Sequence, residues 1–247
     1  MPVYGILYLL GLVAHFIISG HFASKLNLKG RLGFAVSVCY VLGMVPGAKL
    51  LYQWHHVGFD PTVLFSVKHY LQGGFWGGLL AYVVLAVAVA MLLSRRRRAA
   101  LDLIALSTPI PWALAKTGCL LHGCCNGRPC SLPWAITFSE GSASTYVGIP
   151  VHPSQVYEII MMIALFIVLL LLNNKAWRGT LLFWFVGLYG VGRAATDVFR
   201  GDVDRYIYIG PVTLTQLVCL VSASVSLVVL VCMKSASTGV TSDDPSQ

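Results

Sequence analysis

Residues 188–204 read LYGVGRAATDVFRGDVD, and they place charged side chains directly after an apolar run. At 3.6 residues per turn, a helix here sets Arg193, Asp197 and Arg200 on one face. The preceding residues are apolar enough to be embedded in a membrane, so we expect Arg193 inside the hydrocarbon or just beneath its edge. An ionisable group at that depth marks a functional site by default. The alternative is an ion pair between Arg193 and Asp197 that only holds this helix to its neighbours.

The composition of the whole chain agrees with a membrane location. Hydrophobic residues make up 57% of the 247 residues and charged residues only 11%, far from the usage of soluble domains. We therefore expect an all-α integral membrane protein with about seven transmembrane helices, and with re-entrant or interfacial segments on the outer side. The predicted spans are residues 3–19, 33–51, 73–93, 99–121, 156–172, 179–197 and 212–233. Residues 1–234 would form a single transmembrane domain, and residues 235–247 a polar, disordered cytoplasmic tail.

The formal net charge of +8 is explained by membrane orientation. The positive residues form no stripe interleaved with aromatic residues, so nucleic acid is not an expected partner. If the helices alternate in direction, the following positive residues share one side: Lys25, Lys29, Arg31, residues 95–98, Lys175, Arg178 and Lys234. The positive-inside rule puts that side in the cytoplasm, with the N-terminus outside and the C-terminus inside. The first helix has no basic leader or cleavage site and is expected to be retained.

A second polar cluster follows residue 111, in the segment PWALAKTGCLLHGCCNGRPCSLPW. It begins with Lys116, which lies in an apolar helix and could either face a cavity or extend to the nearby interface. Four cysteines and His122 follow within a short distance. A zinc site is not expected, because no C-x2-C pair is present and Cys124 and Cys125 are adjacent. A disulfide, for example between Cys119 and Cys130, is possible. The interpretation we favour is small side chains packed in a tight re-entrant turn.

Two further stretches are of interest. Residues 147–158, VGIPVHPSQVYE, return the chain to the membrane with His152 and Tyr157 near the start of a helix. Glu158 lies close to the positive end of that helix dipole, where a carboxylate is favoured. Residues 73–80, GGFWGGLL, surround Trp76 with glycines that allow either close helix packing or a lipid against the backbone.

Three of these stretches resemble the bacterial prolipoprotein diacylglyceryl transferases. They are KTGCLLHGCCNG (residues 116–127), HPSQVYE (residues 152–158) and YGVGRAATDVFR (residues 189–200). Together with GGFWGGLL, the similarity extends over most of the predicted helices. The resemblance implies a multi-pass protein of the bacterial cytoplasmic (inner) membrane that needs no metal or other cofactor. It also implies transfer of diacylglyceryl from phosphatidylglycerol to the lipobox cysteine of a lipoprotein precursor, recognised through its signal peptide, with release of glycerol phosphate.

The same resemblance implies the residues of the site. Arg193, Lys116, His152 and His122 are expected to be catalytic. The residues expected to bind substrate are Arg200, Asp197, Tyr189, Gly118, Asn126, Gly127, Gln155, Tyr157, Glu158, Trp76, Gly77 and Gly78. Cations suit this chemistry because a phosphate leaves as the thiolate attacks.

This chain departs from the family pattern at several positions. Lys116 replaces an arginine, Trp76 replaces a histidine and Asp197 replaces a glutamate. Cys119 and Cys124 replace an asparagine and a glutamate. Lysine keeps the charge but lacks the bidentate fork of arginine. A divergent member with another lipid donor or acceptor, an anion or lipid transporter without enzymatic activity, and a thiol or metal protein built on the cysteines are the competing hypotheses.

Overall fold

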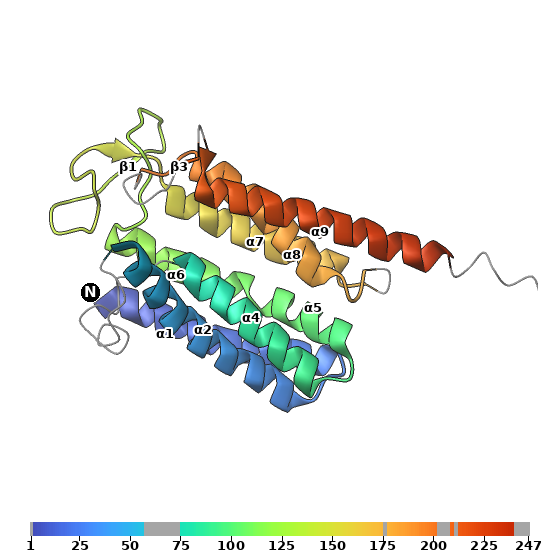
Figure 1. The fold of residues 1–247 in the computed structure, drawn as a ribbon. Helices are drawn as coiled ribbons and strands as arrows, with labels where there is room; N and C mark the ends of the chain where they lie inside the picture. The colour runs from blue at the N-terminus through green and yellow to red at the C-terminus, as the bar shows by residue number, and fades with distance from the viewer. Residues whose placement is uncertain (1, 57–74, 175–176, 202–207, 210–211, 240–247) are drawn as a thin grey trace, which may run out of the picture. The chain divides into compact units, whose positions relative to one another are not determined.

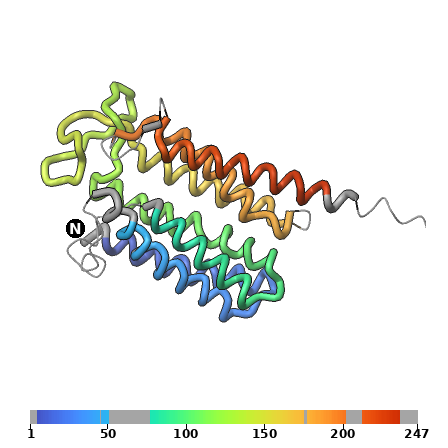
Figure 2. The backbone as a smooth tube through the Cα atoms, viewed as in Figure 1, coloured from blue at the N-terminus to red at the C-terminus, as the bar shows by residue number. Residues whose placement is uncertain are grey.

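The computed structural model describes residues 2–56, 75–174, 177–201, 208–209 and 212–239 (Figure 2). In chain order its helices are α1 (Pro2–Lys25), α2 (Gly30–His56), α4 (Phe75–Leu93), α5 (Arg97–Ser107), α6 (Pro109–His122), α7 (Ser154–Leu172), α8 (Leu181–Asp197) and α9 (Leu214–Gly239) (Figure 1). Two antiparallel ribbons pair β1 (Ile136–Thr137) with β2 (Pro150–Val151), and β3 (Tyr208–Ile209) with β4 (Val212–Thr213). The helical prediction is confirmed. The ribbons were not predicted, because two-residue strands leave no periodic signal in a sequence.

Four helical segments in the described ranges are long and apolar enough to cross a membrane. They are Gly5–Lys25, Gly30–Leu50, Ser154–Leu172 and Leu214–Ser235, and Gly77–Leu93 is a shorter apolar helix. The chain is thus a multi-pass membrane protein, but this does not establish all seven predicted spans.

Two predicted segments differ from the structure. The span predicted over residues 99–121 is divided into α5 and α6, because Pro109 cannot donate the backbone hydrogen bond that would continue the first helix. The tail was predicted from Ser235, and α9 continues past that residue to Gly239. The remainder of that tail lies outside the described residues, as does most of the loop before α4.

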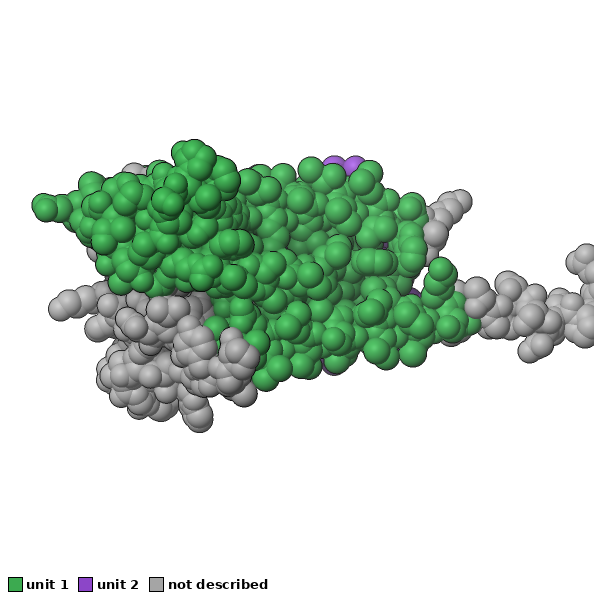
Figure 3. All heavy atoms as spheres, turned by 90° about the horizontal axis from the view of Figure 1, so that it is seen from above, with its two compact units in different colours: residues 1–11, 109–247 green, residues 12–108 purple. Residues whose placement is uncertain are grey.

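The chain divides into two compact units, which Figure 3 colours separately and which we describe one at a time. Unit 2 comprises residues 12–108, and in it α2 packs along α4. Glycines allow this close approach: a Cβ atom at Gly43 would collide with the backbone of Tyr82, and one at Gly78 with the carbonyl group of Met44. Helix packing therefore accounts for Gly78.

The interior of unit 2 contains a polar network. The ring of His15 is fully buried and its two nitrogens lie 3.0 Å from Ser37 Oγ and 3.1 Å from Tyr82 Oη. Tyr82 Oη in turn lies 3.3 Å from Thr108 Oγ1. Each buried polar group thus has a partner, which is what an apolar surrounding requires. The network ties α1, α2 and α4 together.

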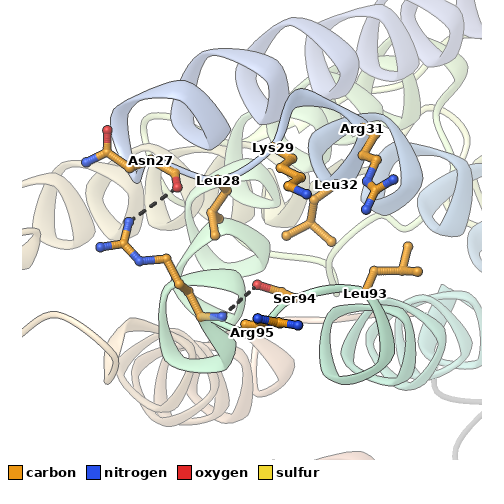
Figure 4. Close-up of a pocket in the computed structure, with 9 residues that line it drawn as sticks. Asn27, Leu28, Lys29, Arg31, Leu32, Leu93, Ser94 and Arg95 are labelled. Carbon is orange, nitrogen blue, oxygen red and sulfur yellow. Dashed lines mark hydrogen bonds between the residues drawn. The ribbon is translucent and has the colours of Figure 1, made fainter.

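A basic pocket of about 580 Å³ lies at one end of unit 2 (Figure 4). The turn between α1 and α2 supplies Lys29, the first turn of α2 supplies Arg31, and the turn between α4 and α5 supplies Arg95 and Arg96. The Arg96 guanidinium donates to the carbonyl oxygen of Asn27 at 3.3 Å, which joins the two turns. These basic loops therefore share one end of the unit, as the positive-inside pattern predicted.

Unit 1 comprises residues 1–11 and 109–247. In it α6 packs on α7, α7 on α8, and α8 on α9, and Figure 1 shows α7, α8 and α9 running side by side. Small residues bring α8 and α9 together, since a Cβ atom at Gly190 would meet the carbonyl oxygen of Cys219 at 2.5 Å. Lys116, Glu158 and Arg193 lie on three of these helices, all within unit 1.

Candidate functional site

One buried carboxylate joins two cations in unit 1. Lys116 Nζ, from α6, lies 2.9 Å from Glu158 Oε2 on α7, and Arg200 Nη1 lies 3.0 Å from Glu158 Oε1. Lys116 is 4% exposed, Glu158 1% and Arg200 7%. The alternative in which Lys116 extends to the interface is therefore wrong. A lysine and a glutamate in apolar helices each require an opposite charge, because an unpaired buried ion is costly.

A second buried ion pair lies on α8. Arg193 Nη1 donates to Asp197 Oδ1 at 2.7 Å, as the spacing of four residues predicted. The Thr213 hydroxyl donates to the other carboxylate oxygen of Asp197 at 2.8 Å. Thr213 also caps α9, because its Oγ1 accepts the amide of Gln216 and its own amide donates to Gln216 Oε1, each at 3.0 Å. The start of α9 thus orients the carboxylate that holds Arg193.

Among the residues that the structure describes, these two groups bring three cations and two carboxylates together. Lys116, Arg193 and Arg200 are three buried cations, and Glu158 and Asp197 are the two carboxylates that pair with them. Glu158 and Arg193 lie on the adjacent helices α7 and α8, and we call the two groups together the cation cluster. Buried arginine and lysine side chains suit an anionic ligand such as a phosphate diester, because they can donate charge-assisted hydrogen bonds to its oxygens.

Three segments cross at Gly127. Its amide donates to the carbonyl oxygen of His152 at 3.1 Å, and the neighbouring Arg128 amide donates to the carbonyl oxygen of Phe199 at 3.0 Å. A Cβ atom at Gly127 would collide with the His152 carbonyl oxygen and lie 2.8 Å from that of Phe199. This crossing, rather than a longer α8, positions Arg200. The helix expected through Arg200 ends at Asp197, because the chain leaves it to form a bridge with Gly127.

We expect Gly127→Ala to separate these segments and displace Arg200. Overpacking a close backbone contact costs about 1–3 kcal/mol of unfolding free energy. Thermal unfolding of the purified protein measures the change. Gly20→Ala is the matched control, because a Cβ atom at Gly20 meets no atom within 4 Å and alanine favours the helix. Equal melting temperatures for Gly127→Ala and the control would contradict the crossing.

His152 lies beside this crossing, just before α7. Its Nδ1 is 3.2 Å from Tyr157 Oη, which accepts a hydrogen bond from Trp134 Nε1 at 2.9 Å. Burial, and then the charge of Arg128, lower the pKa of His152 below its usual value of 6.5. The imidazole is therefore neutral at physiological pH and able to accept a proton.

The remaining predicted residues of unit 1 lie around the cluster in different ways. Gly118 is buried in α6, and Tyr189 is buried on α8 with its ring centroid 4.9 Å from that of Trp112. Asn126 is buried and its carbonyl oxygen accepts the amide of Gly201 at 3.0 Å. Gln155 is fully buried and donates to the carbonyl oxygen of Cys124 at 2.8 Å. They lie on α6, on the loop that follows it, on α7 and on α8.

Four other predicted residues are not brought to the cluster by any contact we describe. His122 ends α6, and its carbonyl oxygen accepts the amide of Ala143 at 2.9 Å. Trp76, Gly77 and Gly78 lie in α4, in unit 2, so their part in the site stays a prediction.

The cysteines differ from expectation. All seven are free thiols, so the possible disulfide between Cys119 and Cys130 is absent. The Sγ atoms of Cys119, Cys124 and Cys125 lie within 4.8 Å of one another. Packing in a tight turn accounts for part of this arrangement. The three thiols lie close together although this segment contains no C-x2-C pair.

Sequence reasoning missed Thr213 and Trp134. The T-x-x-Q spacing from Thr213 to Gln216 signals a helix start, and could have located the cap of α9. Nothing local connects that cap with Asp197. Trp134 gave no signal either, because its partner Tyr157 is distant in sequence.

Comparison with known proteins identifies the family of the chain. The family model of the prolipoprotein diacylglyceryl transferases matches residues 1–232. A phosphatidylglycerol–prolipoprotein diacylglyceryl transferase of Geobacter sulfurreducens is 29% identical over 225 residues, which cover 87% of this chain and 84% of the relative. Proteins of that same name from Clostridium tetani and Clostridioides difficile are 28% and 25% identical, covering 81% and 88% of this chain and 80% and 85% of the relatives. The chain is therefore an enzyme of the prolipoprotein diacylglyceryl transferase family.

Proposed function

We propose that this chain transfers the diacylglyceryl group of phosphatidylglycerol to the thiol of the lipobox cysteine in a lipoprotein precursor. The observation that carries the proposal is the cation cluster, which gathers three buried cations on the family's motifs. Relatives over most of the chain bear the name of this activity. The reaction needs no metal or other cofactor.

In the proposed reaction the thiolate sulfur attacks the glyceryl carbon that carries the phosphate. The new bond joins carbon to sulfur, the bond from carbon to phosphate oxygen breaks, and glycerol phosphate leaves with the electron pair. Negative charge grows on the departing phosphate, so buried cations stabilise the transition state. Arg193 acts as an orienting fork and Lys116 as a point charge, while Arg200 adds a third cation. Asp197 and Glu158 hold these cations in place.

The thiol proton needs an acceptor, and His152 is our first candidate. Its lowered pKa keeps the ring neutral at physiological pH, and its Nδ1 is oriented by Tyr157. His122 is the second candidate, on the strength of the motif alone. The leaving phosphate itself is the third.

We expect the activity of the wild type to fall as pH drops through the lowered pKa of His152, below 6.5. Protonation then removes the acceptor. His152→Gln should abolish that acidic limb of the pH profile and lower the rate, while His122→Gln should leave both unchanged. A profile that is identical in the wild type and both variants would exclude the two histidines and leave the phosphate as the acceptor.

The transferase is tested in bacterial cells depleted of their own enzyme. A reporter lipoprotein precursor should gain the diacylglyceryl mass when this chain is expressed. A reporter whose lipobox cysteine is replaced by serine is the control and should gain nothing. An unmodified reporter in cells that contain the folded chain would favour a divergent donor or acceptor, or a transporter.

We further propose that the N-terminus faces outward and the C-terminal end of α9 faces the cytoplasm, because the basic loops 25–31 and 95–98 share one end of unit 2. A cysteine placed at Ser235 should resist a membrane-impermeant thiol reagent in intact cells and react after lysis. The control is a cysteine placed at Gly141, in the loop on the opposite side, which should react in intact cells. Reaction at Ser235 in intact cells would reverse the orientation.

A further inference from the structure

Three thiols converge at the end of α6. Cys119 lies in the last turns of the helix, and the chain then folds back through Gly123 and Cys125, whose φ angles are +83° and +60°. This reversal places the Sγ atoms of Cys119, Cys124 and Cys125 within 4.8 Å of one another. A non-glycine residue with positive φ is uncommon, and here it directs a thiol toward the other two.

The turn is held from α7 by buried side chains. Ser154 Oγ donates to the carbonyl oxygen of Cys125 at 2.7 Å, and Gln155 Nε2 donates to that of Cys124 at 2.8 Å. Both Ser154 and Gln155 are fully buried. Outer contacts of this kind set the direction of metal ligands in known sites. The three thiols are thus positioned by the fold and not only by their own turn.

The cluster is reached from one side. Metal ions bind thiols as thiolates, so an ion that enters must displace the thiol protons. Cys124 and Cys125 are partly exposed, which leaves a route for an ion, whereas Cys119 closes the inner side.

We propose that Cys119, Cys124 and Cys125 form a three-thiolate site for a thiophilic divalent metal ion of the zinc class. Zinc–sulfur bonds of about 2.3 Å place tetrahedral ligands roughly 3.8 Å apart, so a small inward shift of the thiols suffices. Binding releases the thiol protons to solvent. The test of this site does not depend on the proposed transfer reaction.

The test is a titration of the purified, reduced full-length protein with Cd²⁺, whose bonds to thiolates absorb in the ultraviolet. We expect the absorbance to saturate at one equivalent per chain. Replacing Cys119, Cys124 and Cys125 together with serine should abolish it, and Cys119→Ser alone should weaken binding at least about tenfold. Cys130→Ser with Cys232→Ser is the matched control and should bind as the wild type does, because neither thiol belongs to the cluster.

A second measurement avoids any dependence on the folding of the variants. In the wild type, one equivalent of Cd²⁺ should slow alkylation of Cys119, Cys124 and Cys125, as mapped by mass spectrometry, and leave the exposed Cys232 unaffected. Bound metal should also raise the melting temperature, because it binds the folded state. Failure of the absorbance to saturate, its persistence in the triple variant, or equal protection of Cys232 would each overturn the site.

Discussion

Arg193→Ala is expected to abolish transfer, with the rate reduced to about one-thousandth or less, as for loss of a central donor to a developing oxyanion. Arg193 contributes both charge and fork geometry, and it is held by Asp197 at 2.7 Å. Arg193→Lys should therefore leave a remnant of activity, because charge is retained and the fork is lost. Rates are measured with phosphatidylglycerol vesicles and a lipobox peptide.

Arg193→Ala also lowers the stability of the protein, and this effect must be separated from the loss of activity. It leaves Asp197 buried without its cation, which costs about 3–5 kcal/mol of unfolding free energy. Arg193→Met combined with Asp197→Asn removes both charges and should restore much of the melting temperature while remaining inactive. If this double variant is stable and active, Arg193 serves only to pin α8 to its neighbours, which was the alternative that the sequence left open.

Lys116→Ala is expected to lower the rate by about a hundredfold or more, because a buried cation next to the leaving phosphate is lost. Lys116 lies 2.9 Å from Glu158 and is almost fully buried, so the change acts inside the cluster and not at the surface. Lys116→Arg should retain activity or raise it toward phosphatidylglycerol, because arginine keeps the charge and adds a bidentate fork. Normal turnover by Lys116→Ala would mean that the cluster is structural and the resemblance marks only the fold.

A matched surface control makes the Lys116 result specific. Arg96→Ala removes a cation from the basic pocket of unit 2, where Arg96 joins two turns through backbone carbonyls. It should leave the transfer rate within about twofold, since exposed cations of this kind contribute little.

The changes in kcat and KM of Lys116→Ala separate two roles of the lysine. A loss confined to kcat indicates contact with the phosphate in the transition state, and a rise in KM alone indicates substrate binding.

Local patterns predicted the parts of the site that depend on one helix. The spacing of Arg193 and Asp197 gave their ion pair directly, because residues four apart in a helix are neighbours. The same reasoning failed for Arg200. α8 ends at Asp197, and the following residues pair with Gly127, a contact between segments far apart in the sequence.

Ion pairs between different helices could not be predicted from the spacing of residues within one helix. Glu158 was expected at a helix start, where the dipole favours a carboxylate, yet it bridges Lys116 and Arg200. Periodicity cannot pair residues on different helices. Charge balance could have done so, since a lone lysine and a lone glutamate in apolar helices each need an opposite charge. The spacing rule for metal-binding cysteines did not predict the cluster of three thiols. Gly123 and Cys125 have positive φ angles and reverse the chain there.

The most direct test of the account is transfer by the purified chain in vesicles of phosphatidylglycerol, with both products measured in one reaction. The account predicts that a lipobox peptide gains one diacylglyceryl group for each glycerol phosphate released. Vesicles of phosphatidylcholine and a peptide with serine in place of cysteine are the two controls, and neither should give product. Absence of both products with phosphatidylglycerol, in protein whose melting curve shows it to be folded, would contradict the central claim.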